Sequence, residues 1–245
     1  MNSYCDFAYI YDRLMHSDID YERYADYIEN IFSMYDVSSD LVCDLACGTG
    51  NLTVPLSKRG YNMTGIDISE DMLNIARKKS AGLDILYINQ NITSLDLYGT
   101  MGAFTCGIDG INYIIAPKAL LYMFKRIKNC FLDPNGILVF DISTEYKLKT
   151  VIGCNTFIHS EREIFYSWQN RYIETKKLSD MYLNFFVRSK NGYRRFEERH
   201  LQKAYSCDEL TAILKCAGFC DIKTFDYLSF DAPKPDSERI VFVCR

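Results

Sequence analysis

Residues 41–67, LVCDLACGTGNLTVPLSKRGYNMTGID, contain two short apolar segments joined by a turn of small residues. Leu41–Leu45 is followed at once by turn residues, which predicts a buried parallel strand. Gly48 and Gly50 allow the backbone to approach a ligand that a Cβ atom would exclude. Asp67 ends the next apolar segment, where an acid in a doubly wound sheet can accept hydrogen bonds from ribose hydroxyls. The stretch therefore predicts a nucleotide-cofactor site.

The spacing of the glycines distinguishes two kinds of cofactor. A dinucleotide site needs G-x-G-x-x-G, so that a pyrophosphate can bind at the N-terminus of the next helix. This chain has A-C-G-T-G-N at residues 46–51 instead. Asp44, at the start of the turn, would repel a pyrophosphate. A carboxylate at this position favours a cofactor that carries a cationic amino group.

The segments around this turn predict an α/β fold. Strands are expected at residues 41–45, 63–66, 85–88, 101–106, 136–141, 221–227 and 239–244, and helices at 21–32, 70–79, 120–131 and 208–217. Ser69 and Ser206 are good N-caps, and Gly218 is a typical helix end. Alternation of strands and helices predicts parallel pairing with right-handed crossovers. We therefore expect a doubly wound, seven-stranded, mostly parallel sheet of the Rossmann-like type.

Residues 156–204 break the alternation. They contain aromatic-rich segments with alternating polarity, separated by turns such as 190–192, which predicts an antiparallel β insertion. We expect residues 1–144 and 205–245 to form the main domain and residues 145–204 to form a lid over the substrate.

The quoted residues resemble two motifs of the class I S-adenosylmethionine (SAM)-dependent methyltransferases. The sequence D-x-A-C-G-T-G from Asp44 is similar to motif I, and T-G-I-D-I-S-x-D-M-L-x-x-A from Thr64 is similar to motif II. The β lid and the Y-D-x-L-M segment from Tyr11 resemble largely uncharacterised bacterial members that lie near small-molecule N-methyltransferases. The resemblance implies SAM as cofactor and a methyltransferase activity.

The resemblance also implies roles for single residues. The methionine moiety of SAM would lie against residues 46–50, its ribose at Asp67 and its adenine on Ile68 and Met72. The cofactor-binding residues expected in this way are Tyr11, Asp44, Ala46, Cys47, Gly48, Gly50, Asp67, Ile68, Met72, Gln90, Asn91, Ile92 and Gly107.

The chain departs from the family pattern at three positions. Ala46 stands where many members have glycine. Asn91 stands where an aspartate often lies beside the adenine amino group, so its amide oxygen would have to accept that hydrogen bond. Thr105 replaces the acid of a usual F-D-x-V strand. The last two departures keep a non-catalytic, SAM-binding regulatory protein among the alternatives.

Candidate residues for the methyl-transfer step, at the sulfonium and at the methyl acceptor, come from four places in the chain. Aromatic rings can hold a sulfonium by cation–π attraction, and Tyr4, Tyr9 and Tyr11 are candidates. Asn112 and Tyr113 follow the expected fourth strand, where family members meet the acceptor. Tyr166 and Trp168 in the insertion could stack on a substrate. His200 has a pKa suited to general base catalysis, so His200 and Tyr113 are the candidate catalytic residues.

The charge of the chain narrows the possible classes of substrate. The 245 residues carry a net charge of −4 and have a pI near 5.5, which argues against a broad nucleic-acid-binding surface. The tetrapeptide N/D-P-P-Y/F of nucleic-acid methyltransferases is also absent after the expected fourth strand, where the chain has G-I-D-G. A small-molecule substrate is therefore favoured over a nucleic acid or protein, which remain alternatives.

The remaining expectations concern metals, membranes and redox environment. Ten cysteines are scattered and no apolar leader precedes them, so we expect a reducing cytoplasm. The three histidines are dispersed and no C-x-x-C pair occurs, so we expect no metal. No apolar stretch approaches the ~20 residues of a membrane span.

Overall fold

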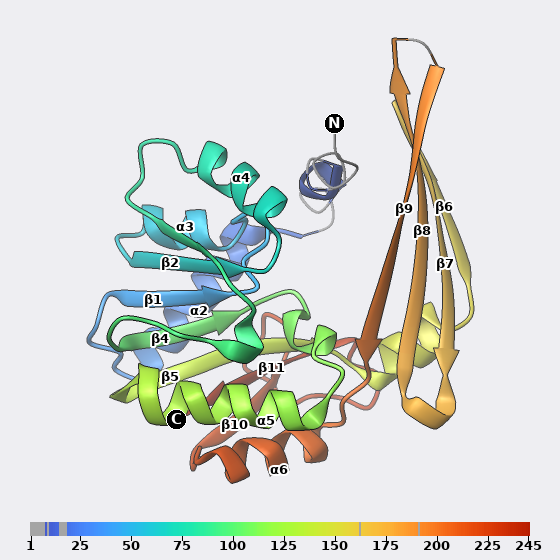
Figure 1. Cartoon of the computed structure of the whole chain (residues 1–245). Coiled ribbons are helices and arrows are strands. Elements are labelled where there is room, and N and C mark those ends of the chain that lie inside the picture. Colours follow the sequence, from blue (N-terminus) through green and yellow to red (C-terminus); the bar gives the residue numbers. More distant parts are fainter. Residues whose placement is uncertain (1–7, 9, 15–18, 162, 191) are drawn as a thin grey trace.

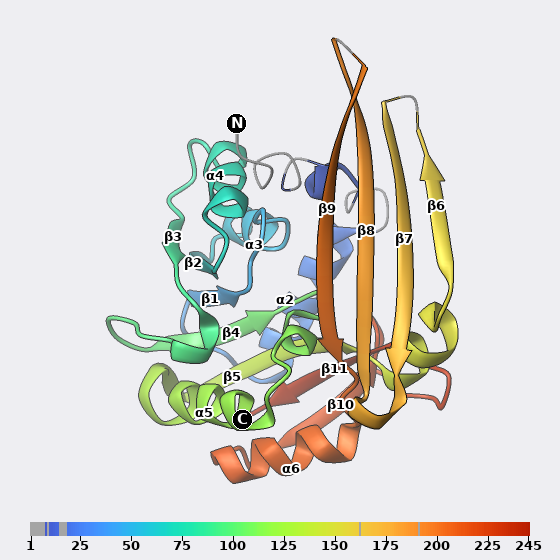
Figure 2. The ribbon, with the colours of Figure 1, turned by 45° about the vertical axis from the view of Figure 1, so that its right-hand side comes forward.

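The computed structural model describes residues 8, 10–14, 19–161, 163–190 and 192–245. These residues form two sheets that lie side by side (Figures 1 and 2). The main sheet has seven strands in the order β10-β11-β5-β4-β1-β2-β3, and the small sheet has four in the order β6-β7-β8-β9. Only β11 runs antiparallel in the main sheet, against β5 and β10. The expected α/β fold with an antiparallel insertion is confirmed.

The strands of the main sheet lie close to their predicted positions. They are β1 (Leu41–Leu45), β2 (Asn62–Asp67), β3 (Leu86–Asn89), β4 (Met101–Cys106), β5 (Leu132–Ser143), β10 (Ile222–Asp226) and β11 (Arg239–Cys244). β4 is central and every one of its residues is buried. β5 is longer than predicted, because the D-P-N-G segment at 133–136 lies inside it, where the pairing with β4 is irregular.

Helices cover both faces of the main sheet. They are α2 (Tyr21–Met34), α3 (Thr53–Lys58), α4 (Glu70–Lys79), α5 (Pro117–Arg126) and α6 (Cys207–Ala217). The apolar sides of α2 and α3 pack on one face, and those of α5 and α6 pack on the other. The predicted caps at Ser69 and Ser206 each accept a hydrogen bond from the backbone of the first helical turn, and Gly218 ends α6 with a left-handed φ of 106°.

Short helical segments join these elements. Three are 3₁₀ turns, η1 (Ile92–Ser94), η2 (Gly110–Tyr113) and η5 (Glu174–Lys176), and two are π-helices, η3 (Ile127–Phe131) and η4 (Tyr146–Ile152). The helix predicted at 120–131 therefore begins earlier, at Pro117, and continues into η3. Proline is favoured in the first turn of a helix because its missing N–H would be unpaired there.

The small sheet consists of β6 (Thr156–Ser160), β7 (Ile164–Ile173), β8 (Leu178–Ser189) and β9 (Gly192–Lys203). Its long strands stand beside the edge of the main sheet at which the parallel strands end (Figure 2). Residues of β7 and β8 pack on η4 at one end, around Leu148 and Met181. Near the other end, Ile10 of the N-terminal segment packs against Phe185 and Phe196. The small sheet thus packs on both η4 and the N-terminal segment.

Among the residues that the structure describes, no helix combines the length and the apolar character needed to cross a membrane.

Candidate active site

The turn after β1 has the left-handed backbone that its small residues favour. Ala46, Gly48 and Gly50 have φ values of 52°, 55° and 76°. A Cβ atom on Gly50 would lie 2.8 Å from the hydroxyl oxygen of Tyr87, so this glycine is required for packing as well as for its φ. A Cβ atom on Gly48 would meet no atom within 4 Å. The turn therefore presents open backbone at Gly48 to whatever binds beside it.

Asp44 lies at the base of this turn and is 2% exposed. Its carboxylate accepts hydrogen bonds from Thr53 Oγ1 at 2.6 Å and from Thr105 Oγ1 at 2.8 Å. Burial raises its pKa to about 6, although the two hydroxyls oppose this shift. The replacement of the usual acid by Thr105 thus provides a hydrogen-bond donor that holds Asp44, and it avoids a second buried carboxylate beside it.

Asp67 ends β2 across from the same turn. Its Oδ2 accepts a hydrogen bond from Gly48 N and its Oδ1 from Ser69 N, both at 2.8 Å. Each carboxylate oxygen can accept more than one hydrogen bond, so both remain able to accept from a ribose. Ile68, the next residue, is 69% exposed, and Met72 lies one turn further along α4. An exposed isoleucine here offers an apolar surface to a planar base.

The side chains of the residues after β3 form hydrogen bonds within their own turn. The side-chain amide of Gln90 both donates to and accepts from the backbone of Asp96. Asn91 Oδ1 caps η1, accepting from Thr93 N and Thr93 Oγ1 at 2.9 Å each. The amide oxygen of Asn91 is therefore already used twice, which does not fit its expected role as the acceptor for the adenine amino group. Its exposed NH₂ group is the part that can face a base. Ile92 follows in η1 and is half-buried.

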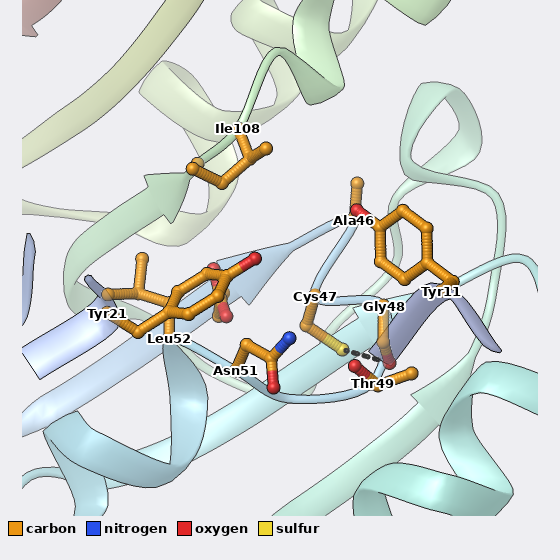
Figure 3. A pocket seen from close by; sticks show the side chains of 11 residues that line it. Tyr11, Tyr21, Ala46, Cys47, Gly48, Thr49, Asn51, Leu52 and Ile108 are labelled. Atoms are coloured by element: carbon orange, nitrogen blue, oxygen red, sulfur yellow. Dashed lines mark hydrogen bonds between the residues drawn. The ribbon is translucent and has the colours of Figure 1, made fainter. Parts of the chain in front are cut away.

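A pocket of ≈50 Å³, here called the turn pocket, lies between the N-terminal segment and the ends of β1 and β4 (Figure 3). The ring of Tyr11 lies toward Ala46 and Gly48, and the ring of Tyr21 lies toward Asn51 and Leu52. Its lining residues are Tyr11, Tyr21, Asp44, Ala46, Cys47, Gly48, Thr49, Asn51, Leu52, Gly107 and Ile108. Six of the residues expected at the cofactor are therefore brought together here.

The N-terminal segment closes this pocket through polar contacts that the sequence did not reveal. Asp12 accepts a hydrogen bond from Thr49 Oγ1 at 2.6 Å and forms an ion pair with Lys79 of α4. Lys79 also donates to the side chain of Asn51. Arg13, the next residue, forms an ion pair with Glu161 of the small sheet at 3.2 Å. Of the expected aromatic candidates, Tyr11 lines the pocket, whereas Tyr4 and Tyr9 lie outside the described residues.

A second cavity, here called the large cavity, has a volume of ≈900 Å³ and lies between the small sheet and the main sheet. Tyr166, Trp168 and His200 of the small sheet line it, as does Tyr113 of η2. Tyr11 and Ile108 line both this cavity and the turn pocket. The two spaces therefore meet at these two residues.

His200 and Tyr113 form a pair in the large cavity. The Tyr113 hydroxyl oxygen lies 3.3 Å from His200 Nδ1, and Tyr113 is 47% exposed. Burial lowers the pKa of His200, and the charge of Asp109 opposes this shift. The imidazole is therefore neutral near pH 7. In the tautomer whose Nδ1–H donates to Tyr113, the Nε2 atom has a lone pair that can accept a proton.

Asn112 has a different position from the one expected. It is fully buried and does not line the large cavity. Its Nδ2 donates to the carbonyl oxygens of Ser143 and Lys203 at 2.9 Å each, and its Oδ1 accepts from Ser143 N at 3.0 Å. Asn112 thus joins the end of β5 to the end of β9. The expectation that it binds the methyl acceptor does not fit this geometry, because all of these polar groups are engaged by backbone.

A strained turn follows β4 between the two cavities. Ile108 and Asp109 have φ values of 53° and 52°, which is rare for any residue with a side chain and rarer for a β-branched one. Their backbone N–H groups donate to the buried carboxylate of Asp141 at 2.7 and 2.8 Å. Asp141 also accepts from the Tyr24 hydroxyl at 2.6 Å and forms an ion pair with Arg239. A strained backbone of this kind persists where several surrounding contacts hold it in place, and such positions are often found at functional sites.

The chemistry of the turn pocket suits the cofactor that its residues imply. The pocket offers a buried carboxylate, Asp44, that suits a cationic amino group and an open backbone at Gly48, to which the carboxylate of Asp67 is hydrogen-bonded. No phosphate-binding run of backbone N–H groups with a third glycine is present in this described turn. The chemistry of the site matches SAM better than a dinucleotide.

Comparison with known proteins identifies the family. Residues 42–136 match the description of a methyltransferase domain. A protein of Geobacillus sp. strain WCH70 that is named as a methyltransferase is 32% identical over 247 residues, covering 99% of each chain. The chain belongs to the SAM-dependent methyltransferases, and SAM is its cofactor.

Solved structures agree with this assignment. The crystal structure of an S-adenosylmethionine-dependent methyltransferase from Clostridium acetobutylicum is 36% identical, with a TM-score of 0.90, and the match covers 100% of this chain and 99% of that one. The sugar N-methyltransferase KedS8 from Streptoalloteichus is 18% identical, with a TM-score of 0.76, covering 96% of this chain and 92% of that one. The latter likeness shows the fold alone.

Proposed function

We propose that the protein methylates an amine or hydroxyl group of a small molecule that binds in the large cavity. The observation that carries this proposal is that the large cavity meets the turn pocket at Tyr11 and Ile108. Its volume of ≈900 Å³ lies within the range of about 300–1,000 Å³ that is usual for small-molecule sites. The shared fold of a sugar N-methyltransferase supports the same class of substrate.

When bound, SAM supplies a methyl group on a sulfonium centre, and its transfer leaves S-adenosylhomocysteine. The residues of the chain orient the reactants. Asp44 binds the amino group of the cofactor and Asp67 its ribose, and the strained turn at Ile108 lies where the cofactor meets the methyl acceptor. Positioning and exclusion of water provide much of the acceleration in such a displacement. The small sheet acts as the lid that excludes water.

The proton balance depends on the nucleophile. An amine that binds in its neutral form attacks the methyl carbon without a base, and the methylated product loses its proton to water afterwards. A hydroxyl must lose its proton as the bond to carbon forms. His200 Nε2 takes that proton, and Tyr113 holds the imidazole through Nδ1.

The test is methyl transfer from tritium-labelled SAM to fractionated pools of metabolites, RNA, DNA and protein, with and without a chelator. Labelled product is expected only in the metabolite pool, with and without chelation. Asp67→Ala serves as the control, because it removes a cofactor ligand and leaves the large cavity unchanged. Label that appears only in RNA, DNA or protein would overturn the proposed substrate class and leave the cofactor assignment intact. Binding of SAM without transfer to any pool would favour a regulatory protein.

A further inference from the structure

The large cavity contains one interior cation that the proposed reaction does not use. Three residues of clear positive charge line the cavity: Lys147, Lys234 and Arg239. Arg239 is paired with Asp109 and Asp141, and Lys234 is exposed. Lys147 is half-buried, and its ammonium group forms no hydrogen bond or ion pair with the residues that the structure describes. A half-buried ammonium without a partner is costly, because burial removes water from the charge.

The carboxylates of Asp109, Asp226, Asp236 and Glu238 also line the cavity, but none of them forms an ion pair with Lys147 among the residues that the structure describes. Burial is the main cause that lowers the pKa of Lys147, and the charge of Arg239 adds to it. The carboxylates of Asp109, Glu238 and Asp141 oppose this shift. Asp109 is engaged by Arg239 at 2.6 Å and by the Gln202 amide.

The other two carboxylates are also accounted for. Asp141 is fully buried beneath the strained turn, where four donors surround it. Glu238 is exposed and therefore hydrated. None of the three carboxylates forms an ion pair with Lys147, so its ammonium group remains available to a ligand.

Aromatic side chains line the same cavity as Lys147. Lys147 belongs to η4, and Trp168 packs against the apolar side chains of that helix. The indole N–H of Trp168 is buried and has no hydrogen-bond partner among the described residues. Phe157 lies against Trp168, with ring centroids 5.3 Å apart, and also lines the cavity. The cavity therefore offers a cation and flat apolar surfaces to a ligand.

We propose that the methyl acceptor carries an anionic group, a carboxylate or a phosphate, that binds the ammonium group of Lys147. The inference rests on the small-molecule function proposed above and specifies its substrate class. A charge-assisted hydrogen bond fixes the acceptor at η4, and the aromatic wall holds its apolar part. Lys147 is thus a specificity-determining residue at the end of the cavity formed by η4.

The test uses fluorescence, because Trp168 is the only tryptophan of the chain and lines the cavity. Four probes share one ring and differ in charge: phenylacetate, phenyl phosphate, neutral phenylacetamide and cationic phenethylamine. Each is titrated into the full-length protein saturated with S-adenosylhomocysteine. At least one anion is expected to bind about tenfold more tightly than phenylacetamide, as expected for a hydrogen bond to a charged group. The stronger of the two anions distinguishes a carboxylate from a phosphate.

Variants show whether Lys147 is the cause. Lys147→Met should abolish the preference for the anion and leave phenylacetamide binding unchanged, whereas Lys147→Arg should retain the preference. Lys149→Met is the matched control, because Lys149 is two residues away, is exposed and pairs with Glu174 outside the cavity. Unchanged binding of S-adenosylhomocysteine shows that each variant is folded.

Three outcomes would overturn the inference. They are equal or tighter binding of phenylacetamide or phenethylamine, an anion preference that survives Lys147→Met, and no anion-dependent change in fluorescence. None of them depends on methyl transfer, so each is distinguishable from failure of the proposed function.

Discussion

Arg239 of β11 and Asp109 of the strained turn after β4 form an ion pair of 2.6 Å, and the guanidinium of Arg239 is 10% exposed. The same guanidinium pairs with Asp141, which holds the backbone of that turn. The last strand of the chain therefore fixes the turn at which the two cavities meet.

Loss of this pairing should destabilise the protein. Arg239→Gln leaves two buried carboxylates without their cation, so the free energy of unfolding should fall by about 3–5 kcal/mol. Urea unfolding measures the change. Arg171→Gln is the control, because Arg171 is exposed and pairs with Asp180 at 3.4 Å, so its loss should cost less than about 1 kcal/mol. Equal losses from the two variants would contradict a structural role for Arg239 in this turn.

Asp67 should contribute directly to cofactor affinity. Asp67→Ala removes the charged acceptor of the ribose hydroxyls, so S-adenosylhomocysteine binding should weaken by about 1.5–3 kcal/mol. Calorimetry measures this loss. Glu70→Ala in the first turn of α4 is the matched control, since Glu70 is exposed and pairs only with Arg77 among the described residues. An affinity that is the same in Asp67→Ala as in the natural protein would exclude Asp67 from the site.

Cofactor binding should depend on pH through Asp44. Its pKa is raised by burial to about 6, so the carboxylate becomes neutral as the pH falls below this value. Affinity for SAM, whose amino group is cationic, should therefore be full above about pH 7 and decline below about pH 6. Methylthioadenosine lacks that amino group and should show no such decline.

The raised pKa of Asp44 should change the stability of the unliganded protein in the opposite direction from cofactor affinity as the pH falls. Because the pKa of Asp44 in the folded protein lies above its ordinary value of 3.8, this group makes the unliganded protein more stable as the pH falls from 6 toward 3.8.

For the cofactor prediction, a SAM affinity that rises in acid would contradict the assignment of Asp44 to the amino group.

The role of His200 can be tested with a hydroxyl acceptor once one is found. His200→Gln should reduce the rate by about 10²–10⁴-fold, because the base is lost. Since burial lowers the pKa of His200, the natural enzyme should keep its rate near pH 7 and lose it only below the ordinary histidine value of 6.5. The acid limb should disappear in the variant. For a neutral amine acceptor, the substitution should change the rate little.

Local patterns allowed much of the fold and cofactor site to be predicted. Asp44, the glycine turn and Asp67 lie within one short stretch, and Ser69 and Ser206 act within a single helical turn. The ion pair between Asp109 and Arg239 joins residues 130 positions apart, so no local pattern indicates it.

Asn112 was misassigned for a similar reason. Its sequence position places it near the methyl acceptor, but only tertiary packing shows that its amide joins β5 to β9. The sequence did not point to Lys147, because the absence of a carboxylate partner for its ammonium group is visible only in the folded cavity.

The position of Tyr11 between the two cavities has a consequence for the order of the reaction. A turn pocket of ≈50 Å³ is much smaller than the ~300 Å³ or more of a typical ligand site, so a cofactor held there must extend beyond it along Tyr11. The same tyrosine then forms part of the wall against which the second substrate binds. Steady-state kinetics should therefore follow a compulsory order, with SAM bound first and S-adenosylhomocysteine released last. Product inhibition by S-adenosylhomocysteine should be competitive with SAM and non-competitive with the second substrate.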